Sequence, residues 1–145
     1  MKRGKRFEFL EHTADAYVAA YGDTLEEAFE NAALATFEVM TDTRKIAQKI
    51  RDTVKVEASD EQALLYTWLE QLLIRFETKG NMYSDFKIQK IKKTKYGFTF
   101  TARILGEPFD PKKHPQKVGI KAITYHRMEI DGKPGKVSVK FILDI

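Results

Sequence analysis

Hydrophobic residues recur at helical spacing in two stretches of the 145-residue chain. The first stretch follows Thr24, and its apolar stripe consists of Leu25, Ala28, Phe29, Ala32, Ala33, Phe37 and Met40. The second stripe consists of Leu64, Leu65, Trp68, Leu69, Leu72, Leu73 and Phe76. Thr24–Glu27 and Ser59–Gln62 each have the form of a capping box, which satisfies free backbone amides at a helix start. The pattern predicts one helix ending at about Thr41 and another ending near Gly80.

Apolar and polar residues alternate in much of the remaining chain, which is typical of strands with one buried face. The expected strands are 6–10, 16–21, 53–58, 86–91, 98–104, 118–130 and 137–143. Lys92–Gly97 is expected to be a loop, Asp131–Gly135 a turn, and Gly106–Gln116 an irregular segment. This order predicts an α+β fold, a single domain over residues 1–145 with two helices on one face of a mainly antiparallel sheet. Trp68 is expected in the core of this domain rather than in a ligand site.

The composition excludes several kinds of chemistry. The chain has no cysteine, so disulfides, thiolate zinc sites and a cysteine nucleophile are ruled out. No apolar run follows the basic residues 1–6, so neither a signal peptide nor a membrane span is predicted, and a cytoplasmic protein is expected. Charged residues make up 32% of the chain, which leans towards the composition of a thermophile.

Charge is distributed unevenly along the chain. Residues 7–42 include nine acidic residues and no Lys or Arg, whereas residues 79–145 include fifteen Lys and Arg and six acidic residues. The acidic segment suits a cation or a basic partner, and the basic half suits nucleic acid or an acidic surface. The alternative is that both are solvated faces that mix in three dimensions.

Ionisable residues are concentrated between the first two expected strands, in Glu11-His12-Thr13-Ala14-Asp15. A turn that only reverses the chain more often uses Gly, Asn or Pro. Asp144 and the terminal carboxylate of Ile145 form a second acidic group at the end of the last expected strand. If the sheet brings Asp144 near Asp15, three carboxylates would meet.

Three such carboxylates would need a cation, a basic partner or a proton. Like charges about 4 Å apart repel by roughly 4 kcal/mol at an effective dielectric constant of about 20. Hard oxygen ligands favour Ca²⁺ or Mg²⁺, and a nitrogen from His12 would extend the choice to Mn²⁺. Ordinary structural roles are the alternative: an Asx-turn for Asp15, a core position for His12 and a solvated terminus for Asp144.

Other candidates for chemistry are weaker. His126 is expected on a strand face with Thr124 and Met128, where a histidine is more often packed than catalytic. His114 lies in a proline-bounded loop with nearby lysines that could contact phosphate or keep the loop soluble. The sequence has no glycine-rich phosphate loop, nucleophile elbow or zinc-binding His pair. The basic stretch Lys87–Lys95 lacks the aromatic spacing of an RNA-recognition sheet.

Taken together, these motifs resemble the archease family. The resemblance rests on Phe9–Asp15, Tyr21–Ala33, Trp68–Leu73, Gly106–Asp110, His114, Lys121–His126 and Asp144–Ile145. They span essentially the whole chain in the expected order. One departure is Ala16, where many members carry Ile or Leu, and this difference concerns packing rather than the site.

The resemblance implies a small protein cofactor that is not itself an enzyme. Its expected partner is the tRNA-splicing RNA ligase, which it would activate by promoting guanylylation and multiple turnover. The family's metal site would fall on Asp15, Asp144 and the Ile145 carboxylate, holding Ca²⁺ in the isolated protein, with Mg²⁺ or Mn²⁺ as alternatives. Glu11, His12 and His126 are supporting candidates.

Two other functions stay open at this point. The resemblance also implies a chaperone-like modulator of a tRNA cytosine methyltransferase. From the residues alone, a metal-dependent hydrolase with His12 as base is a weaker alternative. RNA contact is expected to be indirect or weak, and no membrane partner is expected.

Overall fold

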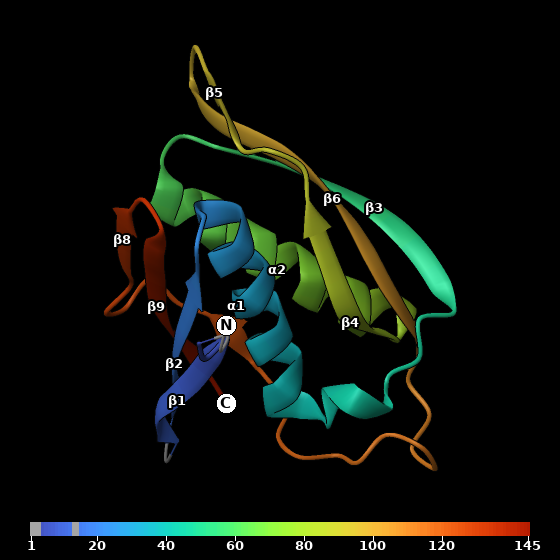
Figure 1. The fold of residues 1–145 in the computed structure, drawn as a ribbon. Helices are drawn as coiled ribbons and strands as arrows, with labels where there is room; N and C mark the ends of the chain where they lie inside the picture. Colours follow the sequence, from blue (N-terminus) through green and yellow to red (C-terminus); the bar gives the residue numbers. More distant parts are fainter. Residues whose placement is uncertain (1–3, 13–14) are drawn as a thin grey trace.

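The fold combines two helices with antiparallel strands (Figure 1). The computed structural model describes residues 4–12 and 15–145, with the backbone alone at His12. In order, the elements are β1 (Phe7–His12), β2 (Asp15–Gly22), α1 (Leu25–Met40), the short 3₁₀ helix η1 (Thr43–Lys45), β3 (Ile50–Ala58), α2 (Glu61–Lys79), β4 (Asn81–Ile88), β5 (Lys92–Thr94), β6 (Gly97–Pro108), β7 (Ala122–Ile123), β8 (Glu129–Lys133) and β9 (Lys136–Asp144). The predicted α+β class is confirmed. Within the described ranges, neither helix is long and apolar enough to cross a bilayer.

The strands form two antiparallel sheets. The first has the order β1-β2-β9-β7, with β8 also paired to β9, and the second has the order β3-β6-β4, with β5 paired to β6. Helix α1 packs against β2 of the first sheet and β4 of the second, and α2 packs against β3 (Figure 1). The helices therefore join the two sheets around one continuous hydrophobic core.

Both helices begin at side-chain caps. The Thr24 hydroxyl accepts a hydrogen bond from the Glu27 amide at 3.1 Å, and the Glu27 carboxylate accepts one from the Asp23 amide at 2.8 Å. At the second helix the cap is Asp60 rather than Ser59, and its carboxylate accepts from the Ala63 amide at 2.7 Å. That helix ends at Gly80, whose φ of 71° lies in the left-handed region that glycine adopts readily.

Trp68 lies at the centre of the core, as predicted. Its side chain is fully buried, and its indole Nε1 donates to the carbonyl oxygen of Phe29 at 3.0 Å. The ring meets Phe100 and Phe86 edge-on, with centroids 5.4 and 6.1 Å away. One residue of α2 thus connects α1 to both β4 and β6.

The predicted strand 118–130 is wrong as a continuous element. Strands β7 and β8 pair with the same edge of β9, where Ile123 lies opposite Leu143 and Glu129 opposite Lys140. Five residues, 124–128, therefore span a distance that two residues of β9 cover, and the excess loops out. The prediction of a loop at Lys92–Gly97 is also corrected. These residues form a hairpin, because β5 pairs with β6 there.

Candidate functional site

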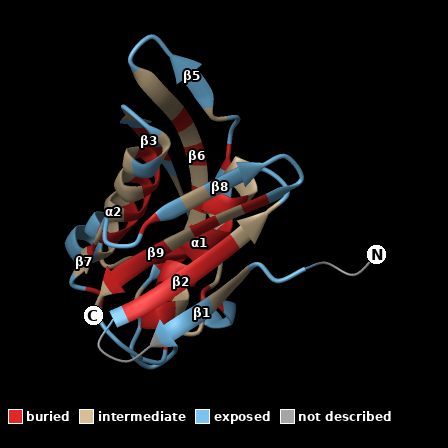
Figure 2. Ribbon diagram, turned by 90° about the vertical axis from the view of Figure 1, so that its left-hand side faces the viewer, coloured by how far each residue is buried: buried red, intermediate tan, exposed pale blue. Residues whose placement is uncertain are grey.

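The ladder between β2 and β9 places Asp15 directly opposite Asp144. Side chains directly opposite each other in antiparallel strands share a face, with Cβ atoms about 4.5–5.5 Å apart. Ile145 follows at once, and its side chain packs against the core, which fixes the end of the backbone. The condition set from the sequence, that the sheet brings Asp144 near Asp15, is met by this register. Figure 2 shows β2 and β9 side by side near the C-terminus.

The two carboxylates have no neutralising partner among the described residues. Neither side chain forms an ion pair or a hydrogen bond with that part of the chain. Asp15 is exposed and Asp144 is half-buried, so solvent reaches the pair. Like charges directly opposite each other in a sheet are destabilising. A bound cation would remove this repulsion, and its ligands here would be hard oxygens.

The other candidate residues do not complete a larger cluster. Among residues 4–11 and 15–145, no three His, Asp or Glu side chains come together as metal ligands would. Glu11 is exposed on β1, opposite Tyr17, beyond a register shift. The His12 side chain, like Thr13 and Ala14, lies outside the described residues. Within the described part of the chain, no His or third acidic side chain therefore joins the pair.

His126 lies on the 124–128 loop and not on a strand, which corrects the prediction. The loop is held by two ring contacts on either side of this exposed histidine. Tyr125 stacks on Tyr66 of α2 with centroids 4.3 Å apart, and the Arg127 guanidinium lies 4.4 Å from the ring centroid of Tyr17. Arg127 has a φ of 56°, which is uncommon for a residue other than glycine and fits a tight turn.

Arg127 brings positive charge to the face that carries the carboxylate pair. Tyr17 is two residues from Asp15 along β2, so the two side chains share a face of the sheet. This is a cation–π contact, in which the planar guanidinium lies over the ring and remains positively charged. The site therefore combines two unpaired carboxylates with a guanidinium stacked on a tyrosine ring two residues along β2 from Asp15.

Sequence reasoning missed a buried ionic cluster around Glu107, whose exposed fraction is 4%. Its carboxylate accepts hydrogen bonds from the Ala47 amide at 2.7 Å and from Lys113 Nζ at 2.7 Å. His114 Nδ1 accepts from the Asp110 amide, so its proton is on Nε2, which donates to Glu107 at 2.9 Å. Burial opposes ionisation of Glu107, but the hydrogen bonds from Lys113, Ala47 and His114 outweigh it and lower its pKa to about 2.

This cluster gives His114 a structural role. A buried histidine, 1% exposed, that is hydrogen-bonded through both ring nitrogens holds the proline-bounded loop against β6. The only sequence signal was a histidine inside that loop seven residues after a glutamate at its start.

The acidic side chains of α1 also serve internal contacts. Glu30 accepts from the Ile88 amide at the end of β4, and Glu26 accepts from the Ile91 amide in the segment that follows β4, each at 2.8 Å. Glu38 accepts from the Thr43 hydroxyl at 2.7 Å and forms an ion pair with Lys117 at 2.7 Å. These three glutamates are therefore engaged in internal contacts and do not form a free acidic face for a partner.

Known proteins resemble this chain over nearly its full length. Residues 7–145 match the model of the Archease protein family. Protein archease of Sulfurisphaera tokodaii is 43% identical over 97% of this chain and 99% of its own, and that of Pyrococcus abyssi is 44% identical with the same coverage. The solution structure of protein 1598 from Methanobacterium thermoautotrophicum aligns with a TM-score of 0.80 at 40% identity, covering 97% of this chain and 99% of the other. A Thermotoga maritima protein, described as an archease and possible chaperone, shares the fold with a TM-score of 0.61 at 18% identity, covering 100% and 98% of the two chains.

Proposed function

The chain belongs to the archease family, and on this basis we propose that it is a non-enzymatic cofactor of the cytoplasmic tRNA-splicing RNA ligase. In this role it promotes guanylylation of the ligase and so supports multiple turnover. The observation that carries the proposal is the position of Asp15 opposite Asp144. Like charges directly opposite each other on adjacent strands destabilise the fold. A bound cation would offset this repulsion, which supports a ligand-binding role for the pair.

The donor atoms fit a hard divalent cation. Asp15, Asp144 and the carboxylate of Ile145 would hold it, with Ca²⁺ expected in the isolated protein and Mg²⁺ or Mn²⁺ as alternatives. When bound, such an ion supplies positive charge that can be shared with phosphate oxygens. Glu11, His12 and His126 are proposed as supporting residues because they lie on the adjoining strand or loop.

The two strands β2 and β9 hold these carboxylate oxygens in fixed positions. Asp15 and Asp144 are anchored by the β2–β9 ladder, and the Lys121 amide donates to the Asp144 carbonyl oxygen at 2.7 Å. Ladder positions hold side chains more tightly than loop positions, so the pair can dock into a partner's site without reordering. Because the complex is transient, charge around the pair should govern the rate of association.

Replacing Asp15 or Asp144 with asparagine should lower multiple-turnover RNA joining by the ligase at least about tenfold, because each change removes one anionic ligand at nearly constant shape. The measurement uses a 3′-phosphate and a 5′-hydroxyl RNA with the ligase in limiting amount. Asp131→Asn is the matched control, since Asp131 is exposed on the same face of the first sheet but opposite Ser138. Calcium titration of the ligase-free proteins reports the metal site separately. Full activation by both folded asparagine variants would contradict the proposal.

A chaperone role is the second candidate, because the Thermotoga maritima relative is described as a possible chaperone. On this view the partner would be a tRNA cytosine methyltransferase kept soluble by surface contacts. The two asparagine variants should then suppress aggregation of the methyltransferase as well as the original protein does. Charge reversal at Glu26 or Glu30 is unsuitable as a test of surface charge, because these side chains accept hydrogen bonds from the backbone amides of Ile91 and Ile88.

A further inference from the structure

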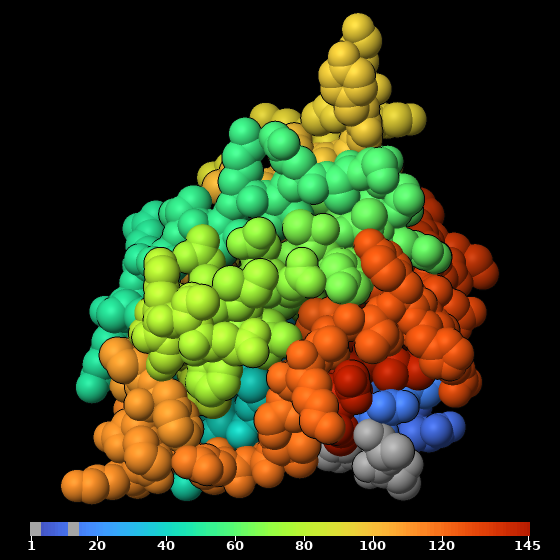
Figure 3. All heavy atoms as spheres, turned by 180° about the vertical axis from the view of Figure 1, so that it is seen from behind, coloured from blue at the N-terminus to red at the C-terminus, as the bar shows by residue number. Residues whose placement is uncertain are grey.

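The hairpin of residues 89–97, here called the basic arm, projects beyond the rest of the second sheet (Figures 1 and 3). It carries four lysines, Lys90, Lys92, Lys93 and Lys95, and no acidic residue occurs between Phe86 and Gly106. None of the four is in an ion pair with a described residue. Their positive charge is therefore presented to solvent.

The tip of the basic arm exposes an aromatic ring. Tyr96 is 82% exposed, although burying a tyrosine ring is normally favourable. Lys95 Nζ lies 5.7 Å from the ring centroid, and the Tyr96 amide donates to the Thr94 hydroxyl at 3.3 Å, which steadies the turn. A lysine and an exposed ring are thus held together in the turn between β5 and β6.

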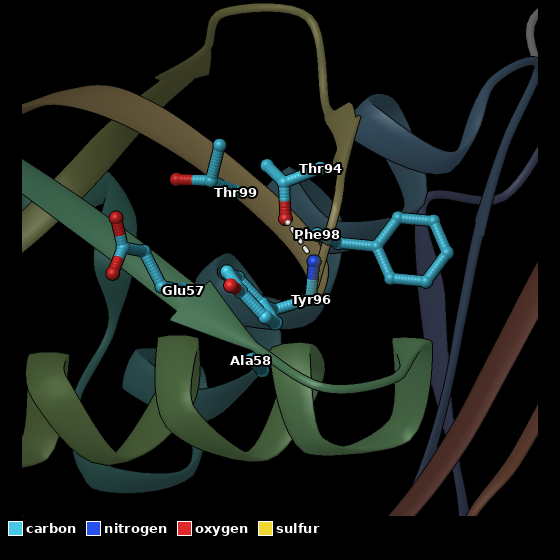
Figure 4. A pocket seen from close by; sticks show the side chains of 6 residues that line it. All are labelled: Glu57, Ala58, Thr94, Tyr96, Phe98 and Thr99. Carbon is cyan, nitrogen blue, oxygen red and sulfur yellow. Dashed lines mark hydrogen bonds between the residues drawn. The ribbon is translucent and has the colours of Figure 1, made fainter.

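A hollow of about 390 Å³ lies between the basic arm and the end of β3 (Figure 4). It is lined by Glu57, Ala58, Thr94, Tyr96, Phe98 and Thr99. One wall is the aromatic ring, and the threonine hydroxyls and the Glu57 carboxylate offer hydrogen-bonding groups near it. The hollow is wide open to solvent, so a base could lie against the ring without being enclosed.

The basic arm continues into a polar face of the second sheet. Strand β6 turns Phe98, Phe100, Ala102 and Ile104 towards the core, so its alternate residues and those paired with them face outwards. The charged residues of this outer face are Arg51, Lys55, Glu57, Asp85, Lys87, Lys92 and Arg103. Basic residues outnumber acidic ones there. The two ion pairs, Lys55–Glu57 and Arg103–Asp85, leave the other three basic residues without an ion-pair partner in the described part of the chain.

We propose that the basic arm and this outer face bind single-stranded RNA, with lysines on phosphates and a base stacked on Tyr96. A row of unpaired lysines attracts a polyanion by releasing its counterions. An exposed aromatic ring beside a basic groove is the usual arrangement for sequence-tolerant binding of single strands. An acidic protein partner fits less well, because lysine is depleted in protein–protein interfaces and the basic arm offers no apolar patch beyond one ring.

This inference departs from the expectation that RNA contact is indirect or weak. It concerns a surface formed by the second sheet, whereas the carboxylate pair belongs to the first. RNA binding by this surface and activation of the ligase can therefore be tested independently, and failure of one does not imply failure of the other.

The test is fluorescence anisotropy with a labelled single-stranded RNA of mixed sequence and the full chain without ligase. Changing Lys90, Lys92, Lys93 and Lys95 to glutamine should weaken binding at least about tenfold near 0.1 M salt. The slope of log affinity against log salt should also fall by about 0.7 for each phosphate that is no longer neutralised by a lysine. Tyr96→Ala should weaken binding about fivefold or more and leave the slope unchanged, because stacking carries no charge.

The matched control changes four other exposed lysines to glutamine: Lys45, Lys112, Lys133 and Lys136. This control has the same net charge as the arm variant and should bind RNA within about twofold of the original protein, given that phosphate binding is local. Equal weakening by both quadruple variants would reduce the effect to net charge and overturn the proposal. The proposal would also be overturned if the original protein did not bind RNA. It would be overturned as well if poly-glutamate displaced the labelled RNA as effectively as unlabelled RNA does.

Discussion

Replacing Glu107 with glutamine should lower the free energy of unfolding by about 3 kcal/mol, as expected when one partner is removed from a buried ionic cluster. The side chain is 4% exposed and accepts from an amide, an imidazole and an ammonium group. A glutamine brings two N–H donors to positions where these groups also donate, so buried donors are left without an acceptor. Urea unfolding followed by circular dichroism measures the change.

The matched control for this prediction is Glu129→Gln. Glu129 is 66% exposed in its side chain and lies 4.0 Å from Lys140 Nζ, so the same chemical change removes only a surface ion pair. That variant should be within about 0.5 kcal/mol of the original protein. If the two variants unfold at the same urea concentration, the Glu107 cluster does not stabilise the fold.

The pKa of Glu107 also predicts a difference in acid sensitivity. In the folded chain this pKa is about 2, below the ordinary value of about 4.3 for the unfolded chain. Between those pH values the unfolded chain binds a proton that the folded chain does not, so the stability contributed by Glu107 is lost as the pH falls. The difference in stability between the original protein and Glu107→Gln should therefore narrow from about pH 5 towards about pH 2.5. Asp42, whose pKa the Arg44 side chain also lowers to about 2, contributes equally to both proteins and cancels.

The helices were predictable because their signals are local. The apolar stripes and the Thr24 cap required only neighbouring residues, and the cap at Asp60 was displaced by one position because serine and aspartate are both good N-caps. The strand at 118–130 failed for a non-local reason. Residues 124–128 leave the ladder while Tyr125 contacts Tyr66 and Arg127 contacts Tyr17, which are distant in sequence. The division into two sheets depends in the same way on which strands pair.

The candidate site shows the same limit. Sequence reasoning could name Asp15 and Asp144 as ionisable residues at strand ends, but only the β2–β9 register makes them neighbours. Whether the acidic segment 7–42 serves a partner could not be decided from the sequence, because the backbone amides that Glu30 and Glu26 bind, those of Ile88 and Ile91, lie some 60 residues away in the chain. Charge counted along a sequence does not distinguish a carboxylate offered to a partner from one that accepts a hydrogen bond from a distant backbone amide.

Replacing Trp68 with alanine should cost about 3–5 kcal/mol of unfolding free energy, the range for deleting a large buried aromatic residue. The indole is fully buried, and the change leaves the carbonyl oxygen of Phe29 without its 3.0 Å donor as well as a cavity between Phe86 and Phe100. Trp68→Phe should cost less, because much of the ring packing is kept and only the hydrogen bond and part of the volume are removed. Ile74→Ala is the control on the same helix, since Ile74 is 43% exposed, and it should cost under about 1 kcal/mol.

Comparing unfolding with metal binding in these variants separates the core from the site. Trp68 joins α1 to α2, β4 and β6, whereas Asp15 and Asp144 are held by the backbone ladder of β2 and β9. Under the proposed metal site, a Trp68→Ala protein that is still folded at low temperature should therefore keep the calcium affinity of the original protein, although it unfolds at a lower temperature. Loss of calcium binding in the folded variant would show that the carboxylate pair depends on the packing between the sheets. A decrease in stability below about 1 kcal/mol would show that Trp68 is not at the centre of the core.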